Sequence, residues 1–351
     1  MLPRERVLLA LSHKITDRVP MDFWGTPETC AHLRAHFRTD DDETVLRALD
    51  IDIREFQPKY MGKITKLPDG SYFDGMGVHR KPVQNKYCTY EEYASSPLGY
   101  VESVEDFDSY KWPDIDLYDF ESLSSQIGDL HETYYIKLFS GGLFELAWAL
   151  RGYEQFMVDM YESPEIAHFI MDKLTDFYCQ FVHRSMKSAG DKFDMVYTYD
   201  DFASQNSLLM SKDMWEEFLK PYHKRLNKVI HSYGKTIMYH SCGAIYDMID
   251  SLAQLPIDVL NPLQPLARGM DFEKINREFG EKLCFHGAIC IQHVLPKGTV
   301  DEVRAAVRHA IGTLGRGGGY ILTSAHNIQS DTPVENIIAM YDAAKNTPMH
   351  A

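Results

Sequence analysis

The chain has 351 residues, a formal net charge of −15 and 44% hydrophobic residues. This acidic balance argues against a nucleic-acid-binding protein, in which Lys and Arg gather on one face. We find no signal-like N-terminus and no apolar run of about 18 residues. We therefore expect a cytoplasmic protein with six reduced cysteines and no nucleic-acid or membrane partner.

The first part of the chain alternates helical and strand patterns. The predicted elements are helices over 3–13, 26–37 and 42–49 and strands over 21–25 and 51–57. Turn residues within 62–86, including Pro68-Asp-Gly70 and Gly75-Met-Gly77, predict a β-hairpin inserted after strand two. Insertions of this kind commonly form the mouth of a site.

The rest of the chain continues the same alternation. Further strands are predicted near residues 135, 195, 237, 258, 284 and 320. Together these give about eight parallel-type strands, seven of them followed by a helix, which is typical of an α/β fold of the (β/α)8 TIM-barrel type. A doubly wound sheet is the alternative, but its Gly-x-Gly-x-x-Gly after strand one is absent. We predict a single barrel domain over residues 1–351.

One short strand, residues 236–239, ends in His240-Ser-Cys-Gly243. In extended backbone the side chains of His240 and Cys242 point to the same side. An imidazole and a thiol directed at one point form half of a soft metal site, for which zinc is the expected ion. The alternative is that the two side chains only pack there.

The other predicted strand ends carry further polar and aromatic residues. In a barrel, active sites lie at the C-terminal ends of the strands. The residues there are Asp22, Phe23, Trp24, Tyr60, Ser140, Asp200, Asp201, Asn261, His286, Cys290, His326 and Asn327. His326, His286 or Cys290 could complete the metal site, and Asp200 or Asp201 could supply an oxygen ligand. Three protein ligands with one open position are typical of a catalytic zinc.

These residues resemble a known family, the uroporphyrinogen decarboxylase superfamily, in its zinc-dependent, corrinoid-linked methyltransferase branch. The segments that carry the resemblance are His240-Ser-Cys-Gly243, Asp200-Asp201 with Gln205-Asn206, Gly317-Gly-Gly-Tyr320, His326 to Pro333, and Arg4 to Leu8 with Asp17 to Pro20. The resemblance covers essentially the whole chain and implies a (β/α)8 barrel. Methyltransferases of this branch bind zinc through His-x-Cys and a later Cys. His326 stands at the later position, so the implied ligands are His240, Cys242 and His326, with Cys290 as the fallback.

The resemblance also implies an activity. Decarboxylases of the family carry an early Met-Arg-Gln-Ala-Gly-Arg stretch, but this chain has Met21-Asp-Phe-Trp-Gly-Thr-Pro27 there, without arginine. The expected reaction is therefore methyl transfer from a small methylated substrate, preferably a methoxylated aromatic, to a corrinoid. No Asp-x-His-x-x-Gly of a cobalamin module is present, so a separate corrinoid protein would carry the corrinoid.

The expected roles follow from the strand-end positions. Asp200 and Asp201 are the candidate catalytic residues. The candidate substrate-binding residues are Asp22, Trp24, Tyr60, Tyr199, His286 and Asn327. Three alternatives remain: methyl transfer from methylcobalamin to a thiol, decarboxylation without metal by Asp200 or Asp201 with His326, and a non-catalytic barrel that binds a tetrapyrrole or a corrinoid protein. The sequence leaves the choice between monomer and homodimer open.

Overall fold

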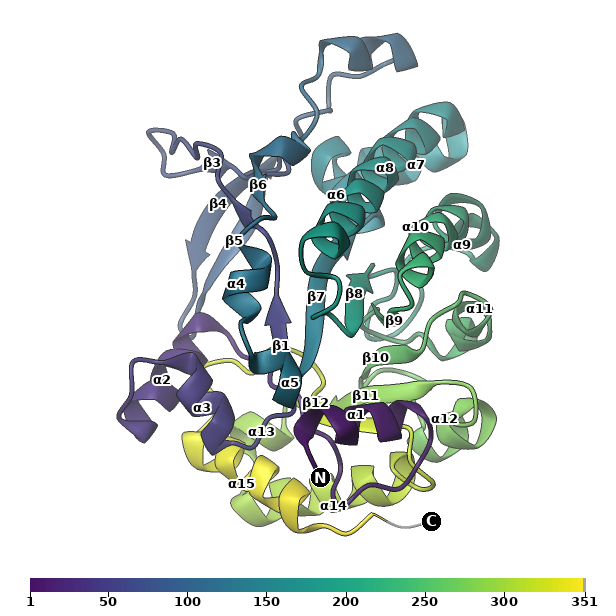
Figure 1. Cartoon of the computed structure of the whole chain (residues 1–351). Coiled ribbons are helices and arrows are strands. Elements are labelled where there is room, and N and C mark those ends of the chain that lie inside the picture. Colours follow the sequence, from purple (N-terminus) through teal and green to yellow (C-terminus); the bar gives the residue numbers. More distant parts are fainter. Residues whose placement is uncertain (350–351) are drawn as a thin grey trace.

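A curled parallel sheet of seven strands forms the centre of the computed structural model, which describes residues 1–349 (Figure 1). The strands, in spatial order, are β1 (Ile53–Phe56), β7 (Tyr135–Gly142), β8 (Met195–Tyr199), β9 (Thr236–His240), β10 (Val259–Leu263), β11 (Cys284–Ile289) and β12 (Tyr320–Ser324). Spatial order follows chain order, as expected of a sheet built from repeated strand–helix units. The arrangement is consistent with a TIM barrel, and it confirms seven of the predicted strands.

The predicted strand over residues 21–25 is wrong, because only two isolated bridges form there: Met21 with Leu322, and Gly25 with Ile328. The amide of Asp22 donates to Leu322 O at 3.0 Å, and the amide of Asp52 donates to Met21 O at 2.9 Å. This segment therefore lies between β12 and β1, at the two edges of the sheet. One reason that it is not a regular strand is local. The Asp22 carboxylate accepts a hydrogen bond from the next amide, that of Phe23, at 2.9 Å, and such bonds compete with strand pairing.

Buried charged residues hold the segment at Met21 in place. Asp52 is fully buried and accepts from Arg6 Nη1 at 2.5 Å, from Arg18 Nη1 at 2.7 Å and from the amide of Met21 at 2.8 Å. Two arginines are needed because an unpaired buried carboxylate is costly. The Arg4 to Leu8 and Asp17 to Pro20 segments thus have a structural role at the N-terminal end of the strands.

Helices cover the outer face of the sheet (Figure 1). The main ones are α6 (Phe144–Arg151), α7 (Tyr153–Glu162), α8 (Pro164–Ala189), α9 (Lys212–Phe218), α10 (Lys220–Ser232), α11 (Ile249–Ala253), α12 (Phe272–Phe279), α14 (Val300–Leu314) and α15 (Val334–Asn346). The first helix, α1 (Pro3–Leu11), instead packs its Val7 against the inner face of the sheet. Two more, α2 (Pro27–Phe37) and α3 (Asp42–Ala48), precede β1, and the side chain of Thr26 caps α2 as predicted. Shorter helical segments are α4 (Leu123–Ile127), α5 (Leu130–Thr133), α13 (Val294–Lys297), η1 (Val104–Ser109), η2 (Ile115–Leu117) and η3 (Tyr246–Met248). A search of the helices within residues 1–349 finds none whose length and apolarity would suffice to span a bilayer.

The segment between β1 and β7 contains antiparallel strands, where the sequence predicted a hairpin over 62–86. Strands β3 (Tyr72–Phe73), β4 (His79–Gln84) and β5 (Thr89–Ser95) form a three-stranded sheet, and β2 (Lys59–Tyr60) pairs with β6 (Tyr118–Asp119). In Figure 1 these strands stand apart from the helices that cover the sheet. One contact with the α/β part matters below: Tyr93 of β5 donates to Glu145 of α6 at 2.9 Å.

Candidate metal centre and the adjoining cavity

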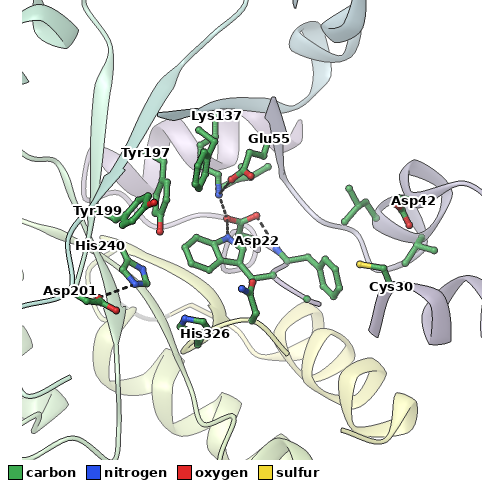
Figure 2. Close-up of a pocket in the computed structure, with 18 of the residues that line it drawn as sticks. Asp22, Cys30, Asp42, Glu55, Lys137, Tyr197, Tyr199, Asp201, His240 and His326 are labelled. Atoms are coloured by element: carbon green, nitrogen blue, oxygen red, sulfur yellow. Dashed lines mark hydrogen bonds and ion pairs between the residues drawn. The ribbon is translucent and has the colours of Figure 1, made fainter. Parts of the chain in front are cut away.

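A cavity of about 700 Å³ lies inside the curled sheet (Figure 2). It is lined from several directions, including β1, β7, β8, β9, the start of α6 and the helices α2 and α3. The lining residues are Asp22, Phe23, Trp24, Gly25, Cys30, Asp42, Val45, Leu46, Ile53, Glu55, Lys137, Phe139, Glu145, Tyr197, Tyr199, Asp201, His240, His326 and Asn327. Five predicted substrate-binding or catalytic residues belong to this lining: Asp22, Trp24, Tyr199, Asp201 and Asn327.

Three of the predicted metal ligands lie together at one end of the cavity. One ligand atom each from His240, Cys242 and His326 lies within 4.8 Å of the others. His240 ends β9, Cys242 follows it in the loop, and His326 is in the loop after β12. The Cys242 Sγ to His240 Nε2 distance is 3.4 Å. The fold therefore brings His326 to the same point as His240 and Cys242, although His326 lies 84 positions beyond Cys242 in the sequence.

The imidazole of His240 is held from two sides. Its Nδ1 hydrogen-bonds Asn261 Oδ1, and because that oxygen can only accept, Nδ1 carries the proton. Trp24 stacks on the other side, with ring centroids 5.8 Å apart and planes inclined by 20°. In the neutral ring the Nε2 atom is the acceptor, and it faces Cys242. This is the orientation of a histidine that binds a metal through one nitrogen and is fixed through the other.

The donor set fits zinc. It combines two imidazoles with one thiol, and zinc accepts both kinds of ligand. Burial lowers the pKa of His326 to about 4, with a further contribution from His240, so the imidazole is neutral at pH 7 as a metal ligand must be. Three protein donors leave room for one more ligand.

Two other proposed ligands take different positions. Asp201 Oδ1 lies 3.5 Å from His240 Nε2 and accepts the amide of Cys242 at 2.7 Å, so it borders the cluster. Cys290, the fallback ligand, is buried after β11, and its Sγ accepts from the amide of His293 at 3.4 Å. It is not part of the cluster of His240, Cys242 and His326 found among residues 1–349.

A chain of hydrogen bonds continues from Asn261 around the inside of the sheet. Asn261 Nδ2 donates to His286 Nδ1 at 2.5 Å, and His286 Nε2 donates to Asp22 Oδ2 at 3.1 Å. Lys137 Nζ then joins Asp22 Oδ2 at 3.0 Å to Glu55 Oε2 at 3.1 Å. Strands β9, β10 and β11 supply the first three side chains, the segment at residue 22 supplies the fourth, and β7 and β1 supply the last two. We call the six residues the polar ring: His240, Asn261, His286, Asp22, Lys137 and Glu55.

The charges of the polar ring stabilise one another. Burial alone would raise the pKa of Asp22, but the Lys137 ammonium and the hydrogen bond from His286 lower it well below its usual range. Burial would lower the pKa of Lys137, but the carboxylates of Asp22 and Glu55 raise it. The ammonium also lies 4.9 Å from the ring centroid of Trp24, a favourable cation–π distance. Lys137 is therefore charged and already fully engaged.

The structure places three predicted site residues away from the cavity wall. Asp200 is fully buried and accepts from the amides of Leu143 and Glu145, at 3.2 and 3.0 Å. Tyr60 packs against Tyr118 in the inserted segment, with ring centroids 5.2 Å apart. His286 is completely buried within the polar ring.

Several cavity residues escaped the sequence analysis, among them Glu55, Lys137, Phe139 and Glu145. The first three lie inside strands, and the rule that places active sites at strand ends does not predict them. Lys137 and Phe139 are two positions apart on β7, so period-two alternation could have placed both on the inner face. Glu145 follows a Gly-Gly pair at the start of a helix, and nothing in the local pattern marks it.

Fold and site together define an α/β protein of the barrel type, with a candidate metal centre at the C-terminal ends of its parallel strands. The sequence profile of the uroporphyrinogen decarboxylase (URO-D) family matches residues 81–347, and the chain belongs to this family. The family expected from the sequence is thus confirmed.

Individual relatives are distant. The chain is 26% identical over 211 residues to a methylated-thiol–coenzyme M methyltransferase of Methanosarcina mazei, a match that covers 59% of this chain and 52% of the relative. It is 22% identical over 193 residues to the uroporphyrinogen decarboxylase of Chlorobium phaeobacteroides, covering 53% and 50%. The chain thus spans about half the length of these curated relatives.

A solved structure shares the whole fold. The structure of a methyltransferase from Methanosarcina mazei superimposes with a TM-score of 0.70 at 17% identity, over 98% of both chains. At this identity the superposition supports the fold alone.

Proposed function

We propose that this protein is a zinc-dependent methyltransferase. It takes a methyl group from a small methylated molecule, preferably a methoxylated aromatic, and passes it to the corrinoid of a separate corrinoid protein. The observation that carries the proposal is the cluster of His240, Cys242 and His326 beside a cavity. The methylated-thiol–coenzyme M methyltransferase among the relatives supports the same class of reaction.

Zinc held by these three residues would act as a Lewis acid on the heteroatom that loses the methyl group. Binding and orientation of the substrate would be done by the side chains of the protein. Trp24, Phe139, Tyr197 and Tyr199 line the cavity with aromatic faces, which suit a planar ring. Asn261 fixes the orientation of His240, and the polar ring fixes Asp22 and Lys137.

The charges of the cavity favour a donor without negative charge. Among the described residues, Lys137 is the one lysine or arginine that lines the cavity, and Asp22 and Glu55 already neutralise it. A carboxylate or a sulfonate would therefore find carboxylates and, among the described lining residues, no free lysine or arginine. This argues against both a tetrapyrrole with many carboxylates and an acceptor thiol with an anionic tail, and so against the decarboxylase and the thiol-methylation alternatives.

An anaerobic assay tests the proposal. Zinc-loaded protein is incubated with cob(I)alamin and 2-methoxyphenol, and methylcobalamin is followed by its absorbance while catechol is measured by chromatography. We expect both products in equal amounts with the wild type and a loss of about 100-fold or more with His326→Ala. Methyl transfer from methylcobalamin to a thiol, without the forward reaction on any neutral methoxyarene, would contradict the proposed direction.

A further inference from the structure

Glu145 is a cavity-lining carboxyl group that lies outside the polar ring. It belongs to the first turn of α6, directly after β7, and is half-buried. Its Oε1 accepts a hydrogen bond from the hydroxyl of Tyr93 at 2.9 Å. Its Oε2 has no hydrogen-bond partner among the protein atoms of residues 1–349. One carboxyl oxygen is therefore anchored, and the other is available to a bound molecule.

The position of Glu145 is fixed by the neighbouring buried residues. Its amide donates to Asp200 Oδ1 at 3.0 Å, and Asp200 Oδ2 lies 2.5 Å from His223 Nε2. Both Asp200 and His223 are completely buried. On the outer side, the guanidinium of Arg80 lies 4.6 Å from the ring centroid of Tyr93. The carboxyl group is thus held between the buried scaffold and the inserted sheet.

The surroundings favour the protonated form of Glu145. Burial raises its pKa, and the carboxylates of Asp201 and Asp200 raise it further, against the opposing effects of the Tyr93 hydrogen bond and of His240. The titratable groups that face it are Asp200, Asp201, His240, Tyr93, Tyr178 and Tyr199, and Arg80 lies behind Tyr93. A carboxyl group with a raised pKa stays protonated to a higher pH than a free glutamate, and in that form it can act as a proton donor.

Resting on the proposed function, we propose that Glu145 donates the proton to the oxygen from which the methyl group departs, and that the substrate class is a methyl ether. In this step the methyl–oxygen bond breaks and the oxygen keeps the bonding electrons. The cob(I) corrinoid supplies an electron pair and takes the methyl group, becoming methylcob(III)alamin. The proton of Glu145 bonds to the departing oxygen, so the product is an alcohol or a phenol, and solvent reprotonates the carboxylate.

The need for a proton separates ethers from other methyl donors. A methylated ammonium or sulfonium ion releases a neutral amine or thioether, which needs no proton. An ether releases an alkoxide or a phenoxide, which leaves poorly unless it is protonated or bound to a Lewis acid. A buried acid on the cavity wall therefore has a use with ethers and none with onium ions.

The experiment compares two ethers that differ in their need for acid: anisole, and 4-nitroanisole, whose phenoxide leaves readily by itself. Wild type, Glu145→Gln and Tyr93→Phe are assayed with cob(I)alamin over a range of pH, with zinc content and thermal unfolding as checks on the fold. Glu154→Gln, an exposed residue on α7 away from the cavity, is the matched control. Infrared difference spectra of wild type against Glu145→Gln report a protonated carboxyl group directly, without turnover.

We expect Glu145→Gln to slow the demethylation of anisole by about 10²- to 10⁴-fold and that of 4-nitroanisole far less. The infrared band of a protonated carboxyl group should persist to a higher pH in the wild type than it would for a free glutamate, and it should be absent from Glu145→Gln. In the wild type the rate should fall as pH rises through the pKa of Glu145. Tyr93→Phe should move this fall to higher pH, because the Tyr93 hydrogen bond lowers that pKa.

Equal losses with both ethers, or a carboxyl band that titrates at the pH of a free glutamate, would overturn the role of Glu145 and leave the proposed function intact. If the wild type transfers methyl from tetramethylammonium but from neither ether, the substrate class is wrong. If the wild type transfers methyl from none of the three donors, the proposed function fails, and the role of Glu145 fails with it.

Discussion

Asn261 fixes the orientation of His240, because its Oδ1 accepts a hydrogen bond from the Nδ1 of His240. Loss of this contact frees the imidazole to rotate and to change tautomer. We therefore expect Asn261→Leu to weaken zinc binding by about 10- to 100-fold, as is typical when the partner of a metal-bound histidine is removed. Titration against a coloured chelator measures the change. Asn227→Leu, a buried asparagine on α10 that lies outside the polar ring, should bind zinc as the wild type does.

Lys137 forms ion pairs with two carboxylates, those of Asp22 and Glu55, and Asp22 is buried. Lys137→Met leaves Asp22 buried without its main counter-charge. We expect the free energy of unfolding to fall by about 3–5 kcal/mol, the usual cost of breaking a buried ion pair. Urea denaturation measures it. Lys81→Met removes a half-exposed lysine 3.7 Å from Asp69 and should cost less than about 1 kcal/mol. A similar small loss for both variants would show that the buried pair does not stabilise the fold.

The pH dependence of the unfolding free energy should reveal the ion pair of Asp22. The pKa of Asp22 is lowered in the folded protein. Its contribution to stability is therefore complete above the unfolded value of about 4 and is lost as pH falls toward the lower folded pKa. The difference in unfolding free energy between wild type and Asp22→Asn should be constant from pH 7 to pH 5 and should shrink below pH 4. A difference that grows in acid would contradict the assigned ion pair.

The two adjacent aspartates should behave differently. Asp200→Ala leaves the amides of Leu143 and Glu145 without partners, and we expect a loss of about 3 kcal/mol in unfolding free energy. Asp201 has a side chain that is 42% exposed, so Asp201→Ala should cost less than about 1.5 kcal/mol while lowering activity. Denaturation curves and methyl-transfer rates of both variants decide between these roles. If Asp200→Ala lost mainly activity and Asp201→Ala lost mainly stability, Asp200 would be the residue that acts in the cavity.

The positions of the strands could be predicted from sequence because each core strand is a short apolar run followed by polar loop residues. Seven of these runs form strands, and the His240-Ser-Cys242 ending lies where the pattern placed it. The segment at Met21 could not be predicted correctly, because the carboxylate of Asp22 binds the following amide and leaves only single bridges.

Site residues inside the strands were harder to recognise. The sequence shows that Asp200 and Asp201 follow a strand, but which of them faces the cavity depends on how α6 packs against that loop. The pairing of Lys137 with Asp22 and Glu55 joins three elements that are far apart in sequence. Local sequence patterns carry no information about such contacts. They therefore predicted that Lys137 lies in a strand, but not that it lines the cavity.

The measurement that tests the metal centre most directly is zinc content by elemental analysis of protein purified without chelator. The comparison uses the wild type, Cys242→Ala and Cys290→Ala, which remove a thiol inside and outside the cluster. We predict about one zinc per chain in the wild type and in Cys290→Ala, and almost none in Cys242→Ala. Zinc that persists in Cys242→Ala but disappears in Cys290→Ala, or a wild type that takes up none after anaerobic addition, would contradict the assigned site.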